Sequence, residues 1–165
     1  MYYSRQKIVD TANMCIGIKE FSNEYRMILA TYNSWAKPHK MYEMTLKDSW
    51  CACFVSACFI TNGYSNIIPC ECSCSRMVAK AKAMGIWYES DEIIPDNGDL
   101  ILYDWQDTGI GDCKGNPDHI GIVTNVYANV ITVVEGNYND SVKERKIKVN
   151  AKYIRGYIKP RYTIS

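Results

Sequence analysis

The chain has 165 residues, a formal net charge of +1 and a hydrophobic content of 47%. These values fit one globular domain with a substantial core, expected over residues 1–165. The near-neutral charge gives no basis for nucleic acid as the main partner, and no apolar run is long enough to span a membrane. The first ten residues lack the basic and then apolar layout of a secretory signal, so synthesis in the cytoplasm without a signal peptide is expected.

The first half of the sequence has helical periodicity. Asp48 or Ser49 can cap a helix that Asn62-Gly63 ends, and Ser73 or Ser75 can cap the next helix. Apolar residues recur at helical spacing in four segments, which are residues 4–20, 23–37, 47–63 and 75–85.

The second half changes to the two-residue period of strands. Pro95, Asn97 and Gly98 predict a turn before the first strand. Helices followed by antiparallel strands indicate an α+β fold, with N-terminal helices packed on a C-terminal antiparallel sheet. Runs rich in β-branched residues predict strands within residues 94–105, 119–126, 129–137, 143–150 and 153–162.

His119 opens one of these predicted strands, and its neighbours suggest a chemical role. If a three-residue loop centred on residue 127 or 128 joins the two strands, His119 pairs with Glu135 or with Asn137. Both registers place all three side chains on one sheet face, whereas an even-length loop would separate them. A carboxylate or amide beside an imidazole fixes its tautomer and orientation.

Three cysteines lie in the helix predicted over residues 47–63. Cys51 lies in the first turn, where unpaired N–H groups and the helix dipole lower the pKa of a thiol. Cys53 lies one step further round, and Cys58 lies two turns along on the apolar side. Cys51 with His119 and Glu135 or Asn137 would form a site for acyl transfer.

Three short motifs follow one another along the chain. They are "WCACFVS" at residues 50–56, "DHIGIV" at residues 118–123 and "VVEGN" at residues 133–137. In this order they resemble the CHAP domain, the cysteine- and histidine-dependent amidohydrolase/peptidase domain of the papain-like NlpC/P60 superfamily, and the resemblance extends over most of the chain. It implies the papain-like CHAP fold.

The resemblance implies a role for each matching residue. Cys51 would be the nucleophile and His119 the base, and Glu135 and Asn137 would orient the histidine, with the choice between the two left open. The implied activity is hydrolysis of an amide bond in bacterial peptidoglycan, as an endopeptidase or an N-acetylmuramoyl-L-alanine amidase, with no cofactor required.

The sequence resembles the group of CHAP domains found in phage and prophage lysins. Such enzymes act on the wall after release through a separate pore, or as part of a virion, which agrees with the missing signal peptide. No wall-binding domain follows the motifs, so a separate chain or domain would supply wall binding. The chain is either a free-standing catalytic domain or a fragment of a longer lysin.

Two other functions are compatible with the sequence. One is a papain-like protease acting on protein substrates. The other is a catalytically silent structural or wall-binding module of a phage. The joint presence of Cys51, His119, Glu135 and Asn137 favours the enzyme.

The segment before His119 partly matches a calcium loop of the EF-hand type, and bound calcium would brace it. Gly115 replaces the glutamate of the twelfth place, so a solvated polar turn is the simpler interpretation. The residues at the first, third, fifth and ninth places are Asp104, Gln106, Thr108 and Asp112.

Cys70, Cys72 and Cys74 occupy alternate positions. Zinc sites usually separate paired cysteines by two or more residues, so free thiols in a loop near the substrate groove are expected.

Overall fold

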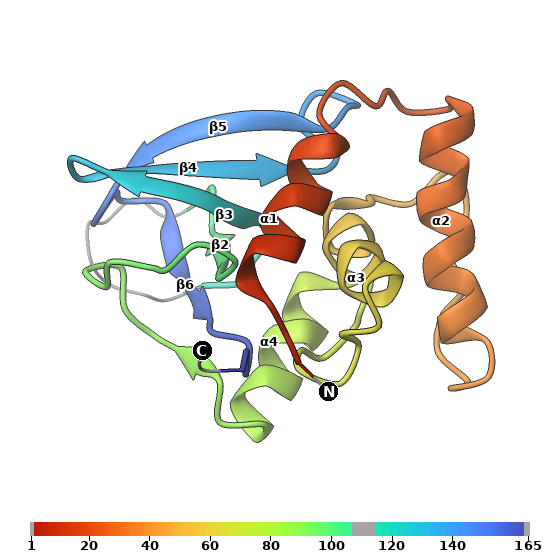
Figure 1. Cartoon of the computed structure of the whole chain (residues 1–165), viewed down its shortest axis with the longest axis horizontal. Helices are drawn as coiled ribbons and strands as arrows, with labels where there is room; N and C mark the ends of the chain where they lie inside the picture. The colour runs from red at the N-terminus through yellow and green to blue at the C-terminus, as the bar shows by residue number, and fades with distance from the viewer. Residues whose placement is uncertain (1, 107–114, 164–165) are drawn as a thin grey trace.

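The computed structural model describes residues 2–106 and 115–163. In this part of the chain, helices pack on one side of a curved antiparallel sheet (Figure 1), so the predicted α+β fold is confirmed. The helices are α1 (Arg5–Met14), α2 (Asn23–Ala36), α3 (Cys51–Thr61) and α4 (Cys74–Ala83). The strands are β1 (Trp87–Tyr88), β2 (Leu100–Tyr103), β3 (His119–Tyr127), β4 (Val130–Glu135), β5 (Lys143–Lys148) and β6 (Ile154–Ile158).

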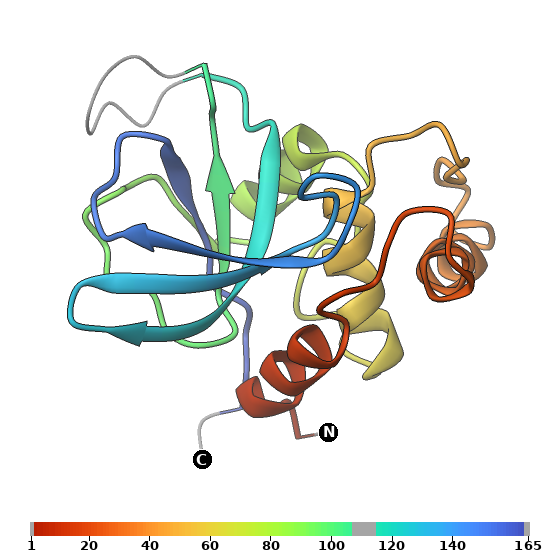
Figure 2. The same cartoon turned by 90° about the horizontal axis from the view of Figure 1, so that it is seen from above.

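The helix α3 is the centre of the core. It lies between α2 and the sheet (Figure 2), and every residue from 51 to 59 is buried. The buried residues of α2 recur at the helical spacing that the sequence predicts for residues 23–37, and they are Tyr25, Ile28, Leu29, Tyr32 and Ala36. An apolar helix covered on both sides holds the residue at its first position firmly, and that residue is Cys51.

The beginning of α3 differs from the prediction. Neither Asp48 nor Ser49 caps the helix, because the Asp48 carboxylate accepts hydrogen bonds from the backbone N–H and the hydroxyl of Thr45, both at 2.7 Å. The N-cap residue is Trp50, which provides no side-chain cap. The N–H groups of the first turn are therefore left for other partners.

The sheet has the strand order β1-β6-β2-β3-β4-β5, and all neighbouring strands are antiparallel. Leu100, Leu102 and Ile122 face the helices and belong to the main core. Ile101 and Val133 face the other way and belong to a second buried cluster. Because the sheet curls (Figure 2), residues on both of its faces are buried.

The β3–β4 hairpin has a two-residue turn, so the predicted three-residue loop is wrong. Ala128 and Asn129 both have positive φ, at 48° and 65°, as a type I′ turn requires. A bulge between Val123 and Asn125 adds one residue to β3 and shifts the pairing by one. The bulge therefore compensates for the even-length turn.

Beyond the bulge, Ile122 pairs with Val134. Continuing this register places Gly121 opposite Glu135, so that His119 and Glu135 share a sheet face as the sequence predicts. The shared face allows the side chains of His119 and Glu135 to contact each other.

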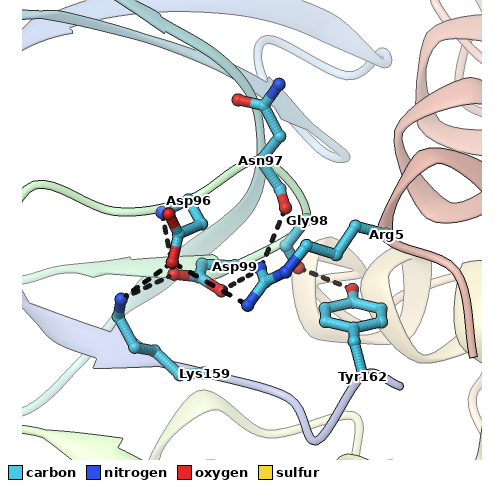
Figure 3. A network of polar contacts seen from close by, with 7 residues as sticks. All are labelled: Arg5, Asp96, Asn97, Gly98, Asp99, Lys159 and Tyr162. Atoms are coloured by element: carbon cyan, nitrogen blue, oxygen red, sulfur yellow. Dashed lines mark hydrogen bonds and ion pairs between the residues drawn. The ribbon is translucent and has the colours of Figure 1, made fainter. Parts of the chain in front are cut away.

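A polar network joins the two ends of the chain to the beginning of β2 (Figure 3). The Asp99 side chain is fully buried, accepts a 2.7 Å hydrogen bond from Arg5 and lies 3.3 Å from the Lys159 Nζ. The Tyr162 hydroxyl donates to the carbonyl of Gly98 at 2.7 Å. The turn before β2 thus holds both α1, through Arg5, and the segment that follows β6.

Within residues 2–106 and 115–163, no helix combines the length and the apolar character that crossing a membrane requires.

Candidate active site

Cys51 is the first residue of α3 and is 4% exposed. Trp50 before it is fully buried, with its ring centroid 5.0 Å from that of Tyr25 in an edge contact. The indole thereby anchors the chain where the helix begins. The thiol of Cys51 lies among the uncapped N–H groups of the first turn, where the helix dipole favours a negative charge.

His119 and Glu135 are brought together by the β3–β4 pairing. The distance between His119 Nε2 and Glu135 Oε2 is 3.0 Å, and the Glu135 side chain is fully buried. Because Nε2 is engaged by the carboxylate, Nδ1 is the ring nitrogen available to Cys51. Glu135 therefore sets the tautomer and the direction of the imidazole.

Gly121 makes room for the Glu135 side chain. A Cβ at this position would lie 2.7 Å from Glu135 Cγ and 2.4 Å from Val133 Cγ1. Only glycine allows the carboxylate to cross β3 at this point.

Arg145 places a positive charge beside the Glu135 carboxylate, and this residue was not predicted from the sequence. Its Nε lies 2.8 Å and 3.0 Å from the two carboxylate oxygens of Glu135. Its guanidinium packs over the rings of Tyr138 and Trp105, at 4.1 Å and 4.8 Å from their centroids. Arg145 pairs with Val133 across the strands β4 and β5, which puts it on the same face as Glu135.

Aromatic rings close the side of the site away from α3. Tyr103 stacks on Trp105 with 4.6 Å between centroids, and His119 lies 5.9 Å from the Tyr103 ring. These rings limit the movement of the imidazole and exclude water from its pair with Glu135.

Asn137 contacts a different part of the site from the one expected. Its Nδ2 donates a 3.1 Å hydrogen bond to the Ser49 Oγ. The residue adopts a φ of 57°, and the contact ties the end of β4 to the loop that precedes Cys51. In this structure Glu135 is the side chain that holds His119, and Asn137 holds the loop.

The family model of the CHAP domain matches residues 41–137, which is more than half of the 165 residues. The chain belongs to the CHAP domain family. The matched range includes Cys51, His119, Glu135 and Asn137, whereas Arg145 lies outside it.

Solved structures resemble this CHAP domain in fold. The crystal structure of Ly7917 has a TM-score of 0.53 and 14% sequence identity, over 95% of this chain and 62% of that chain. The crystal structure of Ly7917 with the hydrolyzing product of MDP has a TM-score of 0.48 and 16% identity, over 95% and 63%. This CHAP domain thus spans less than two thirds of the length of those chains. No curated protein sequence matches it.

The electrostatics of the CHAP site favour a charged Cys51. The pKa of Cys51 is held well below its usual value, first by a hydrogen bond from Cys74 and then, against the effect of burial, by the hydrogen bond and charge of His119. Burial opposes protonation of His119 most strongly, but Cys51 and Glu135 together outweigh it and raise the pKa of His119 to about 9. A thiolate facing an imidazolium is the favoured state near neutral pH.

Glu135 remains ionised although it is buried. Burial is the largest influence and would raise the pKa of the carboxyl, but hydrogen bonds from His119 and Arg145, together with their charges, bring it below its usual value.

The other two cysteines of α3 have the opposite properties. Burial raises the pKa of Cys53, and the nearby Cys72 and Cys51 add to the effect. The pKa of Cys58 is raised well above its usual value, first by its hydrogen bond to Cys15 and then by burial. Both are expected to remain protonated and unreactive.

The structure describes only part of the predicted calcium loop. Thr108 and Asp112 lie outside the described residues, and the Asp104 Oδ1 accepts a 3.0 Å hydrogen bond from the backbone N–H of Gln106. Calcium binding by this loop stays a prediction.

The side chains of Cys70, Cys72 and Cys74 contact three different partners. Cys74 Sγ lies 3.8 Å from Cys51 Sγ, whereas Cys72 contacts Arg76 and Cys70 faces the carbonyl of Ser65. In residues 2–106 and 115–163, no three His, Cys, Asp or Glu side chains form a group that could hold a metal ion.

Proposed function

We propose that this CHAP domain hydrolyses an amide bond of bacterial peptidoglycan, with Cys51 as the nucleophile. The observation that carries the proposal is the position of Cys51 at the uncapped beginning of α3, facing a histidine that Glu135 holds at 3.0 Å. Membership of the CHAP family supplies the substrate class.

The reaction begins with the Cys51 thiolate. Its sulfur attacks the carbonyl carbon of the scissile amide, and the carbonyl oxygen takes up the negative charge. In this proposal the backbone N–H of Cys51, in the uncapped first turn of α3, stabilises that oxyanion. The protonated His119 then gives its proton to the leaving amine, the C–N bond breaks, and a thioester remains on Cys51.

Water completes the cycle. Neutral His119 removes a proton from the water, the hydroxide adds to the thioester carbon, and the C–S bond breaks to release a carboxylic acid and the thiolate. Glu135 stabilises the imidazolium in both half-reactions, and Asn137 keeps the Ser49 loop against the end of β4. These roles require no cofactor.

We assign the whole range 1–165 to one catalytic domain, made in the cytoplasm and acting on the wall after release through a separate pore or within a virion. In this proposal, another domain or chain supplies wall binding. An N-acetylmuramoyl-L-alanine amidase and an endopeptidase both fit this chemistry, and the masses of the products distinguish them.

The decisive experiment is digestion of purified peptidoglycan, with released fragments identified by mass spectrometry. Wild type should release fragments, Cys51→Ala should release none, and Cys53→Ala is the matched control because it removes a protonated thiol from the same helix. Equal release by Cys51→Ala would refute the nucleophile assignment.

Two further outcomes test the alternative functions. Hydrolysis of casein but not of purified wall would indicate a protease of protein substrates. No fragments from several wall types, with calcium present, would indicate a silent structural or wall-binding module.

A further inference from the structure

A second thiol lies against the Cys51 sulfur. The Sγ atoms of Cys51 and Cys74 are 3.8 Å apart, and Cys74 is 7% exposed. Cys74 is the first residue of α4, so the N-termini of two helices meet at this sulfur pair. Substrate hydrolysis as proposed above does not use Cys74.

At most one of the two sulfurs can be ionised. Both lie at helix N-termini, which favour negative charge, but two thiolates at this separation would repel each other strongly in a buried site. One sulfur therefore stays protonated and donates to the other, and the surrounding charges decide which one it is.

The surroundings assign the proton to Cys74. His119 lies beside Cys51 and favours its thiolate. The pKa of Cys74 is raised well above its usual value, by its hydrogen bond to Cys51, by burial and by the charge of Asp118. Among the residues that the structure describes, Cys53 and Glu135 also lie near the pair. Cys53 is protonated, and the Glu135 carboxylate behind His119 compensates the imidazolium charge.

We propose that Cys74 is a positioning residue whose S–H donates a hydrogen bond to the Cys51 thiolate and fixes the direction of the nucleophilic lone pair. This role rests on the proposed function, because it concerns the nucleophile of that reaction. The hydrogen bond gives the thiolate a donor that does not depend on the protonation of His119.

The hydrogen bond has a definite chemical consequence. When Cys51 attacks, its charge passes to the carbonyl oxygen, so the bond from Cys74 weakens in the transition state. Cys74 therefore stabilises the resting thiolate more than the transition state. The hydrogen bond from Cys74 extends the pH range over which Cys51 is ionised. It also lowers the intrinsic nucleophilicity of the thiolate, because a thiolate of lower pKa is a weaker nucleophile.

The test is the pH dependence of Cys51 alkylation by iodoacetamide, measured for that residue alone by mass spectrometry of its peptide. Cys74→Ala removes the donor and should move the half-maximal rate of alkylation up by about one pH unit. Cys74→Ser retains a donor and should restore the wild-type profile. Cys72→Ser, which removes a different thiol from the same segment, should not shift the profile.

Other outcomes overturn the proposal. An unshifted profile in Cys74→Ala refutes it, and so does a Cys74→Ser profile shifted as far as that of Cys74→Ala. If Cys74→Ala fails to fold, judged by its thermal melt, Cys74→Val provides a donor-free side chain of closer size, and an unshifted profile there refutes the proposal too.

Alkylation requires no peptidoglycan, which separates this test from the test of function. A shift in Cys74→Ala without wall digestion by wild type would refute the proposed function and retain the sulfur pair. Wall digestion with no shift would retain the proposed function and refute the role of Cys74.

Discussion

Four neighbouring side chains alternate in charge across the site. The Cys51 thiolate is followed by the His119 imidazolium, the Glu135 carboxylate and the Arg145 guanidinium. Each charge would be costly to bury alone, and each has an opposite charge beside it. The Cys51 thiolate is therefore stabilised by a row of side chains that ends on β5.

The pH dependence of wall hydrolysis should reflect this row. The thiolate–imidazolium pair exists above the lowered pKa of Cys51 and below the pKa of His119, about 9. The rate should be bell-shaped, with its basic limb near pH 9, because His119 must be protonated to release the amine. Initial rates at low substrate concentration measure this. A basic limb near 6.5, the unperturbed value for histidine, would contradict the pairing.

Arg145 should tune the same profile through Glu135. Arg145→Met removes the hydrogen bonds and the positive charge that lower the pKa of Glu135, so that carboxyl should protonate at higher pH and release His119. We expect the acidic limb to move upward and kcat/KM to fall about tenfold, or ~1.4 kcal/mol. Lys146→Met is the control, because Lys146 is the exposed neighbour on β5. A uniform loss of rate at all pH values would indicate a merely structural role.

At the scale of elements, two features of the β3–β4 hairpin together place His119. They are its two-residue turn and the bulge in β3, and their effects on the strand register cancel. The two-residue turn alone would put His119 and Glu135 on opposite faces, and the bulge before Asn125 reverses this. The sequence predicted the shared face from an odd-length loop, so the conclusion was right although the loop length was wrong. A bulge depends on how β3 pairs with its partners, which the sequence does not display.

Gly121 is a position of this hairpin where a side chain would not fit. Gly121→Ala should destabilise the fold by about 2 kcal/mol, because the new Cβ would overlap Val133 and Glu135. It should also lower activity, since Glu135 must move away from His119. Urea denaturation and wall digestion measure the two effects. Asn125→Ala, exposed on the same strand, is the control, and equal stability of the two variants would contradict the steric role.

The helices were predictable wherever periodicity alone decides them. The inward face of α2 and the end of α3 at Asn62-Gly63 are confirmed. The cap of α3 was wrong because Asp48 binds Thr45 in the preceding turn, a choice between two local partners that spacing cannot resolve. Arg145 was missed because its face depends on the register between β4 and β5, and that register becomes visible only in the folded sheet.

At the scale of the whole molecule, the site lies where the two layers meet. Cys51 is the first residue of α3, whereas His119, Glu135 and Arg145 lie on the strands β3, β4 and β5. The geometry of the site therefore depends on how firmly the helices are fixed to the sheet. The network of Figure 3 is one such connection, and it shares no residue with the site.

Asp99→Asn should test that connection. The substitution removes the fully buried negative charge that pairs with both Arg5 and Lys159. We expect the free energy of unfolding to fall by about 2 kcal/mol. The loss is limited to this size because both cations retain some contact with water. Asp96→Asn is the matched control from the same turn. Its side chain is 63% exposed, so a change within about 0.5 kcal/mol is expected. Urea denaturation measures both, and equal losses would contradict the assigned role.

The ends of the described chain also meet. The Tyr3 N–H donates to the Thr163 hydroxyl at 2.8 Å, and the Thr163 N–H donates to the Tyr3 carbonyl at 3.0 Å. Topologically the backbone is almost a closed ring. A short peptide joining the two ends would restrict the unfolded chain and leave the folded one nearly unchanged, so circular permutation with new ends at the Ala128-Asn129 turn should preserve the arrangement of strands and helices.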